Sequence, residues 1–482
     1  MFYKLKMFWQ GFKKEKYLFF DVNDASLALA NNIVKRKKNS VWFLLNELSE
    51  KQNKSIITPN AVCYKQLFST KSSCYDKLLK KLILKRRSCL FFLSLHDDTN
   101  IQSLSLFFTS WNLGKIDKVK QNIKLIIRVQ NELLYPVVEQ IIKDAPFEVN
   151  YSIFNDAELI ASEIVQQHHP IDTLNINTQN ARVDDIYETL IVGWDPLGNA
   201  ILRKTIEATQ LVGTQFKATV MQNNAQQNEY EFFNKYPEIK NYYEVNFINL
   251  EFGSPASLEW LQQHAVTLKQ IFIATGEDEK NLTLSTELCA FFKNRNIPCI
   301  PVVALSRAAK NETVFTEKNV VQLDYFQQAK AVHHFYNQLK PFAQRIPWEN
   351  LSEMKKQVNV AAARSILTKL KLLGKTPDEL KQMSELEYQL FLQQDPDKLL
   401  NIAKSEHLRW NATYITCGWK TWQLHEIPEG APHQDETQKL HACLVDWDSL
   451  NEIEKRFEIP FQSYDYNNIL IIRMLIVNNV IR

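Results

Sequence analysis

The stretch TLIVGWDPLGNA, residues 189–200, decides how the rest of the chain is interpreted. It starts with a short apolar run, as a buried parallel strand does, and continues past a glycine into a helix-like pattern. Gly193 and Gly198 hold the first and third positions of a G-x-G-x-x-G fingerprint, but Asp195 replaces the second glycine. A pyrophosphate normally lies against that second glycine, so the stretch predicts strand, tight turn and helix while Asp195 argues against a diphosphate in the usual pose.

Composition limits the class of protein. The chain has 482 residues, enough for about three domains that each bury a core. A net charge of +3 is close to neutral and does not point to nucleic acid as a partner. The seven cysteines are odd in number and show no C-x-x-C spacing, which predicts reduced thiols of a cytoplasmic protein rather than a zinc site or a disulfide framework.

Several segments invite a membrane or nucleic-acid interpretation. No apolar run reaches the roughly 18 residues that a bilayer requires, and the apolar residues 469–477 are interrupted by Arg473, so we expect a core element there. Residues 1–16 mix aromatic side chains with lysines and lack a signal-peptide cleavage site. They predict a terminal helix packed on its own domain, with a membrane surface or a partner protein as the alternative contacts. The basic runs at 35–38 and 80–87 are typical of solvated faces.

The first part of the chain repeats the second. Residues 17–28 align with 189–200, and residues 91–101 align with 272–282, where an acidic pair and an asparagine recur at the same spacing. Each copy closes with a predicted strand, at 147–154 and at 320–326, followed by a helix. The pattern predicts an α/β protein with two tandem, doubly wound, mainly parallel sheets.

Candidate ligand-binding residues of the second copy fall where its strands end. Ligands of open α/β sheets bind at the carboxyl edge, so the predicted nucleotide-binding residues are Gly193, Asp195, Gly198, Gln222, Glu251, Thr275 and Glu277. Residues 189–304 resemble the nucleotide-binding domain (TrkA-N) of the Trk/RCK regulators of potassium transport, most specifically at ATGEDEKNL, residues 274–282. The resemblance implies a nucleotide, such as NAD, ATP or an ADP-ribose-like molecule, in the second copy. It implies no dinucleotide in the first, which has lost both glycines.

From residue 341 the pattern becomes helical. Thr376, Pro377 and Glu379 supply the cap, first-turn proline and capping-box acid of a helix. Further on, Glu406, Arg409 and Trp410 fall at i, i+3 and i+4, which places them on one helical face. An aromatic plane beside a guanidinium and a carboxylate suits a planar charged ligand. The alternative is structural, with the tryptophan in the core and the charges forming an intrahelical pair.

Taken together, these motifs resemble a known domain. The run EHLRW at 406–410, the pair Gly418-Trp419, the segment from His441 to Leu450 and the run 464–467 resemble the RyR domain, the repeat named after ryanodine receptors. The match covers residues 347–480, and it implies a ligand-sensing role. The predicted ligand-binding residues of this region are Glu406, His407, Arg409, Trp410, Trp419 and His441.

The sequence therefore predicts three domains: a degenerate Rossmann-like domain at 1–170, a nucleotide-binding one at 183–340 and a mainly α, RyR-like one at 341–482. The favoured function is a cytosolic regulatory protein that binds a nucleotide-derived small molecule and signals to a partner, such as a membrane channel or another effector, with a homo-oligomer also open. The alternatives are a regulatory subunit gating a potassium channel or transporter, and an NAD(P)-dependent oxidoreductase. No catalytic or metal-binding constellation is recognised.

Overall fold

The computed structural model describes residues 15–37, 40–44, 61–64, 87–112, 123–145, 149–298, 300–305, 314–322 and 324–480. The predicted terminal helix at 1–16 and the basic cluster at 80–87 lie outside these ranges except at their ends. The chain forms two compact units, Met1–Ile160 with Arg307–Leu323, and Ala161–Ser306 with Asp324–Arg482. The boundaries of the three predicted domains stay a prediction.

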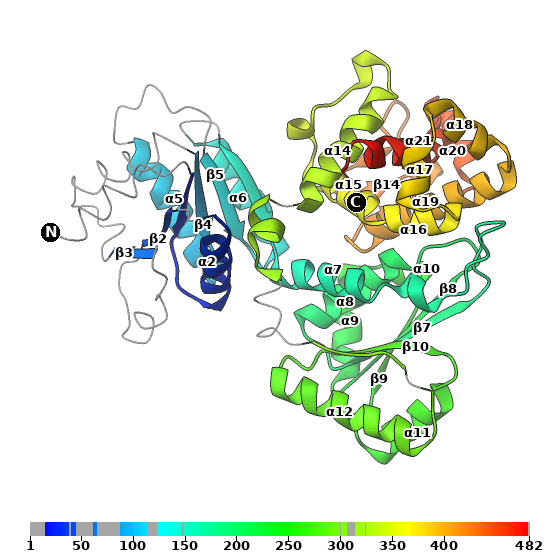
Figure 1. The fold of residues 1–482 in the computed structure, drawn as a ribbon, viewed down its shortest axis with the longest axis horizontal. Helices are drawn as coiled ribbons and strands as arrows, with labels where there is room; N and C mark the ends of the chain where they lie inside the picture. The colour runs from blue at the N-terminus through cyan, green and yellow to red at the C-terminus, as the bar shows by residue number, and fades with distance from the viewer. Residues whose placement is uncertain are drawn as a thin grey trace. The chain divides into compact units, whose positions relative to one another are not determined.

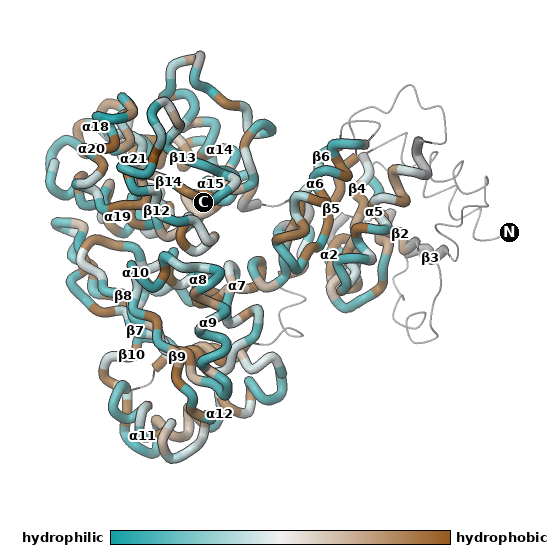
Figure 2. Tube along the Cα trace, turned by 180° about the vertical axis from the view of Figure 1, so that it is seen from behind, coloured by the Kyte–Doolittle hydropathy of each residue, from teal (hydrophilic) through white to brown (hydrophobic). Residues whose placement is uncertain are grey.

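The first unit is built on a six-stranded parallel sheet of order β3-β2-β1-β4-β5-β6. Its strands are β1 (Glu15–Phe19), β2 (Ser40–Leu44), β3 (Ala61–Tyr64), β4 (Arg87–Phe92), β5 (Ile123–Arg128) and β6 (Asn150–Phe154). Its helices include α2 (Asp24–Lys37), α5 (Asp97–Asn112) and α6 (Tyr135–Lys143). Apolar runs such as that of β5 form these strands because both faces of a parallel sheet are covered. Figure 2 shows hydrophobic colour along β4 and β5.

One predicted strand is wrong. Residues Glu317–Gln322 form a π-helix within the first unit, and α14 (Asp324–Gln338) begins where the strand at 320–326 was expected. The π-helix packs on α2, and Val320 is buried within it. Two hydrogen bonds fix it: the Tyr17 hydroxyl donates to Glu317 Oε1 (3.2 Å), and the Glu317 backbone N–H donates to Asn32 Oδ1 (3.0 Å).

The second unit contains a five-stranded parallel sheet of order β11-β10-β7-β8-β9. Its strands are β7 (Ile186–Val192), β8 (Gln215–Gln222), β9 (Glu244–Asn249), β10 (Leu268–Ile273) and β11 (Val302–Ala304). Helices α8 (Pro196–Ala208) and α9 (Ala225–Lys235) lie on one side of this sheet, and α11 (Pro255–His264) and α12 (Asp278–Asn294) lie on the other (Figure 1). In both units the first strand is central and the order reverses beside it, as in Rossmann-like domains. The predicted doubly wound fold class is confirmed.

The repeated asparagine explains why the repeat is visible in the sequence. Strands β4 and β10 occupy the same place in their sheets, each beside the first strand. After β4, Asn100 accepts from the Ser94 backbone N–H (2.8 Å) and donates to the Arg128 carbonyl (2.9 Å). After β10, Asn281 accepts from the Thr275 backbone N–H (2.9 Å) and donates to the Leu305 carbonyl (2.5 Å). One amide thus joins the ends of the fourth and fifth strands in each copy.

The helical region of the second unit follows local sequence signals closely. Its helices are α14, α15 (Glu353–Arg364), α16 (Ile366–Leu373), α17 (Pro377–Gln382), α18 (Glu385–Gln393), α19 (Pro396–Ile415), α20 (Leu450–Phe457) and α21 (Phe461–Val477), with a small sheet of β12 (Lys420–Thr421), β13 (Gln434–Asp435) and β14 (Leu440–His441). Gly374 caps α16 with φ of +67°, and Thr376 with Glu379 forms the predicted capping box. Helix α14 packs against α15 and α21.

The apolar segment at 469–477 lies in α21, where Ile469, Ile471, Ile472 and Leu475 are buried, so the predicted core element is confirmed. None of the helices in the described part of the chain combines the length and apolar composition that a bilayer crossing needs.

Candidate functional site

The glycine turn after β7 is packed against its own sheet. Gly193 has φ of +83°, and a Cβ atom there would lie 2.8 Å from the Ala274 carbonyl oxygen and from Thr275 Cα. A Cβ atom on Gly198 would lie 2.9 Å from Ala274 Cβ. Both glycines are therefore required by the close approach of β10 and its following loop, which accounts for them without any ligand.

Asp195 takes the role that a ligand's phosphate has in other turns of this kind. It is the N-cap of α8, and its Oδ1 accepts from the Gly198 backbone N–H at 2.8 Å. Asn23 does the same in the first unit, where its Oδ1 accepts from the Ser26 backbone N–H at 3.0 Å. A carboxylate at the start of the helix both uses this N–H and repels an incoming anion.

The other predicted residues of this edge lie at or after the ends of β8, β9 and β10. Gln222 ends β8 and pairs in register with Asn249, while Glu251 is exposed after β9. The Thr275 hydroxyl donates to Asn281 (2.6 Å), and the exposed Glu277 precedes two further acids, Asp278 and Glu279, in the first turn of α12. With Asp195 capping α8 and three acids at α12, the edge does not fit a diphosphate in the usual pose.

Replacing Asp195 tests this assignment. We expect Asp195→Ala to lower the free energy of unfolding by about 1 kcal/mol, because the Gly198 N–H loses its cap. Asp195→Asn keeps the acceptor without the charge and is expected to keep most of the stability. Chemical denaturation of both variants checks this; equal losses for Ala and Asn would show that the side-chain cap contributes nothing.

Helix α19 carries the second group of predicted residues, and its charged ones form a buried cluster. Arg409 donates from Nε and Nη2 to the two carboxylate oxygens of Glu406 at 2.8 and 2.7 Å, and Lys369 Nζ lies 2.8 Å from Glu406 Oε2. All three side chains are buried: Arg409 is 5% exposed, Glu406 2% and Lys369 4%. Burial alone would raise the pKa of Glu406, but the two cations hold it at about 2. Burial lowers the pKa of Lys369, although Glu406 opposes this.

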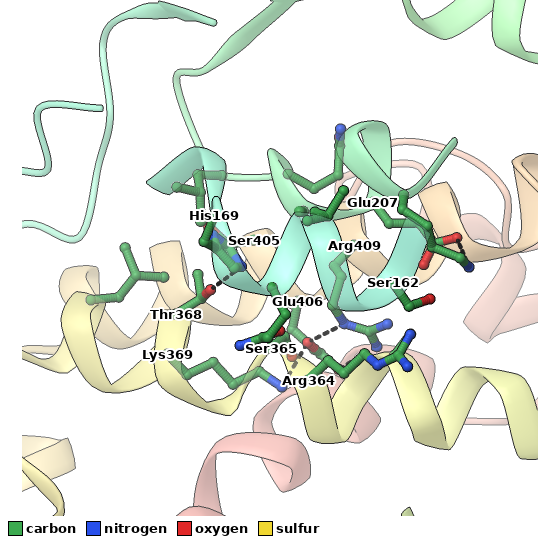
Figure 3. Close-up of a pocket in the computed structure, with 18 of the residues that line it drawn as sticks. Ser162, His169, Glu207, Arg364, Ser365, Thr368, Lys369, Ser405, Glu406 and Arg409 are labelled. Carbon is green, nitrogen blue, oxygen red and sulfur yellow. Dashed lines mark hydrogen bonds and ion pairs between the residues drawn. The ribbon is translucent and has the colours of Figure 1, made fainter. Parts of the chain in front are cut away.

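This cluster lines a small cavity of about 70 Å³ between the second sheet's helix α8 and helices α15, α16 and α19 (Figure 3). Figure 3 shows Arg409 and Lys369 both directed at Glu406. Nearby, the Val212 backbone N–H donates to Ser405 Oγ (3.0 Å), and the Thr416 hydroxyl donates to Glu207 Oε1 (3.0 Å). This face of α19 therefore attaches the helical region to the α/β region.

The neighbouring face of α19 borders a larger cavity, of about 320 Å³. Side chains from α14, α15, α19, α21 and the small sheet surround it, and we call it the aromatic cavity. Its ring-bearing lining residues are His333, Tyr336, His407, Trp410, Tyr414, His433, His441, Phe461 and Tyr464. Ring centroids of Trp410 lie 4.5 Å from Tyr414 and 4.9 Å from His441, so the rings form a continuous wall. The size is within the range of small-molecule pockets.

Two histidines of this cavity have pKa values that their surroundings shift in opposite directions. Burial, together with the charges of His433 and Lys355, holds the pKa of His441 well below its ordinary value. Its Nδ1 accepts from the Cys443 backbone N–H (3.0 Å), so a neutral His441 carries its proton on Nε2. Burial opposes the charged form of His407, but Asp465, 3.3 Å from Nδ1, raises its pKa.

The structure separates the residues that the sequence predicts as one site. Arg409, His407, Trp410 and His441 line the aromatic cavity, whereas Glu406 lines only the smaller one. Trp419 is 3% exposed and packs with Tyr414 and Leu444 in the core. No group of acids, histidines and cysteines in the described ranges is placed to hold a metal ion.

Sequence reasoning missed two lysines of the aromatic cavity, Lys340 and Lys355. They precede the EHLRW run by more than fifty residues, just after α14 and at the start of α15, and no local motif marks them. Only the packing of α14 and α15 beside α19 and α21 could identify them.

Comparisons with known proteins add little. No family model and no curated protein matches the sequence. Among solved structures, a dipicolinate synthase chain from Bacillus halodurans matches with a TM-score of 0.22 and 7% identity, over 63% of this chain and 94% of that chain. The corresponding dipicolinate synthase chain from Bacillus subtilis matches with a TM-score of 0.24 and 8% identity, over 65% and 97%. Such scores carry no argument about this chain.

Proposed function

We propose that this protein is a ligand-sensing regulatory protein whose ligand site is the aromatic cavity of its helical region. The ligand is a nucleotide-derived small molecule, and the binding event is passed to a partner. The observation that carries the proposal is the lining of the cavity: a continuous wall of rings around about 320 Å³, with lysines at its border. The resemblance of residues 347–480 to the RyR domain points the same way.

The chemistry of the lining suits a planar heterocycle. Stacking on Trp410 and Tyr414 supplies affinity through buried aromatic area, and it tolerates many bases because each has a π-face. The Nε2–H of the neutral His441 is a donor for a ring nitrogen or carbonyl of the ligand. These groups bind and orient a ligand, and they do not form a catalytic constellation.

Helix α19 provides the physical basis for a regulatory role. One face carries Trp410 at the aromatic cavity, while the other attaches through Ser405 and Thr416 to the region around α8. A ligand that changes the equilibrium position of this helix would change the α/β region with it, provided that it binds the two positions differently. The oxidoreductase alternative is less well supported, because the Asp195 turn does not fit a dinucleotide.

Truncating Trp410 tests the proposal. We expect Trp410→Ala to weaken binding of the best-bound nucleotide in a panel by about fivefold or more, because base–aromatic stacking contributes about 1–3 kcal/mol. Binding is measured by calorimetry, after a thermal-shift panel of mono- and dinucleotides, ADP-ribose and cyclic oligonucleotides selects the ligand.

Trp260→Ala is the matched control, since Trp260 is a half-buried tryptophan on α11 that does not line the cavity. The proposal predicts unchanged affinity for this variant. Equal losses in the two variants, or a panel that never shifts the wild-type melting temperature, would contradict the proposed site.

A further inference from the structure

The charged residues around the aromatic cavity differ in whether a partner of opposite charge lies beside them. Its charged lining residues are Lys340, Lys355, Arg409 and Asp465, together with the histidines. Arg409 is held by both carboxylate oxygens of Glu406, and Asp465 lies 3.3 Å from His407 Nδ1. Within each pair, Arg409 with Glu406 and His407 with Asp465, the positive charge is balanced by the carboxylate. The two lysines are left to set the electrostatic character of the cavity.

The ammonium group of Lys340 lies over aromatic rings and could also bind an anion. Its Nζ lies 4.6 Å from the centroid of the Tyr336 ring and 5.3 Å from that of Tyr464, both on the cavity lining. Among the described residues, no carboxylate forms an ion pair with it. The ring faces hold the ammonium by cation–π attraction, but they satisfy none of its hydrogen-bonding capacity as a carboxylate or phosphate would.

Lys355 faces the same space from α15. Its carboxylate partner among the described residues, Glu436, is 3.5 Å away, and the two side chains are 36 and 44% exposed, so this pair contributes little. The positive charge of Lys355 lowers the pKa of Lys340, His433 and His441, in each case after the larger effect of burial. The charge of Lys355 therefore acts on the residues of the aromatic cavity. Lys340 and Lys355, whose positive charges repel each other, both line this cavity.

We infer that Lys340 and Lys355 form an anion subsite of the aromatic cavity, and that its ligand carries a phosphate group on or beside an aromatic ring. The inference rests on the proposed function and deepens it. It moves recognition of the anionic group from Arg409, which is paired with Glu406, to two lysines, one just after α14 and one on α15. A phosphate dianion relieves the repulsion between two ammonium groups more completely than a carboxylate monoanion does, because it bears up to two charges on three acceptor oxygens.

Matched pairs of ligands test this inference. Binding of AMP and adenosine, and of GMP and guanosine, is measured by calorimetry at fixed ionic strength for wild type, Lys340→Met, Lys355→Met and the double variant. Methionine keeps an unbranched side chain of similar length and removes the charge. Lys330→Met is the control, since Lys330 lies on α14 outside the cavity lining.

We expect wild type to bind at least one nucleotide about tenfold to a hundredfold more tightly than its nucleoside, as hydrogen bonds to charged groups imply. The double variant should lose this preference while keeping its affinity for the nucleoside, and Lys330→Met should keep both. Nucleoside binding with no preference for the phosphate in wild type, or a preference that survives in the double variant, would overturn the lysine subsite and leave the proposed function intact.

Inorganic pyrophosphate provides an arm that does not depend on the ring. It should raise the melting temperature of wild type above that in chloride of equal ionic strength, and it should not do so for the double variant. Pyrophosphate stabilisation without binding of any nucleoside or nucleotide would support the subsite and refute the aromatic ligand. Absence of both effects refutes the subsite and the proposed ligand together.

Discussion

Arg409→Met is expected to lower the free energy of unfolding by about 3–5 kcal/mol, the usual cost of leaving a buried charge without its partner. Glu406 is 2% exposed and its two oxygens accept both hydrogen bonds of the Arg409 fork. Lys369 would remain on one oxygen only. Urea denaturation followed by tryptophan fluorescence measures the loss, and it should exceed that of a substitution on the surface.

A double variant separates the charge from the shape. Glu406→Leu with Arg409→Met removes both partners, and we expect it to recover much of the stability, because apolar replacement of a buried pair is often neutral. Arg409→Lys keeps the charge but not the fork, so an intermediate loss is expected. If Arg409→Met unfolds like wild type, the cluster is not a structural element.

The same cluster gives a pH dependence. The pKa of Glu406 is about 2 in the folded protein, whereas a free glutamate titrates at about 4.3. A depressed folded pKa contributes stability that is fully present above the unfolded value and is lost as the pH falls from about 4.3 towards 2. We expect Glu406→Gln to flatten the decline of stability in that window.

This assignment also decides between two roles for Arg409. The sequence leaves open whether Arg409 holds the anionic part of a ligand or pairs with Glu406. The fork of two short hydrogen bonds favours the structural role. Arg409→Met should therefore lower the melting temperature and leave the preference for a nucleotide over its nucleoside unchanged. Retained preference for a nucleotide over its nucleoside in a folded Arg409→Lys variant would agree with the lysine subsite.

The second large effect is expected at Gly193. Gly193→Ala should cost about 3 kcal/mol, because a Cβ at φ of +83° is strained and would also lie 2.8 Å from the Ala274 carbonyl oxygen. The atoms in the way are backbone atoms of the loop after β10, which cannot rotate aside as a side chain would.

Gly276→Ala is the matched control in the same edge of the sheet. Gly276 has φ of +85°, but its nearest neighbour to a new Cβ, Asp195 Cβ, would lie 3.7 Å away. Only the backbone term of about 1 kcal/mol is expected there. Thermal denaturation of the two variants compares them; equal losses would show that the contact with Ala274 and Thr275 does not constrain Gly193.

The sequence by itself determined most of the order of elements in the two sheets and much of their local chemistry. Apolar runs of strand length, the repeated asparagine of Asn100 and Asn281, and the Thr376 capping box depend on residues a few positions apart, so they can be identified without the fold. The prediction of a strand at 320–326 was wrong because an apolar run of that length fits a strand or a helix equally well. The π-helix that forms there packs on α2.

Only the tertiary structure decided which side chains share a site. The spacing of Glu406, Arg409 and Trp410 places them on one side of α19, but the packing of α8 and α16 against it directs Glu406 into a charged cluster and leaves Trp410 at the aromatic cavity. Lys340 and Lys355 join that cavity from helices distant in sequence. The partner of a charged side chain depends on the residues that surround it in the folded protein. A sequence pattern identifies such partners only within one turn of a helix or along one strand.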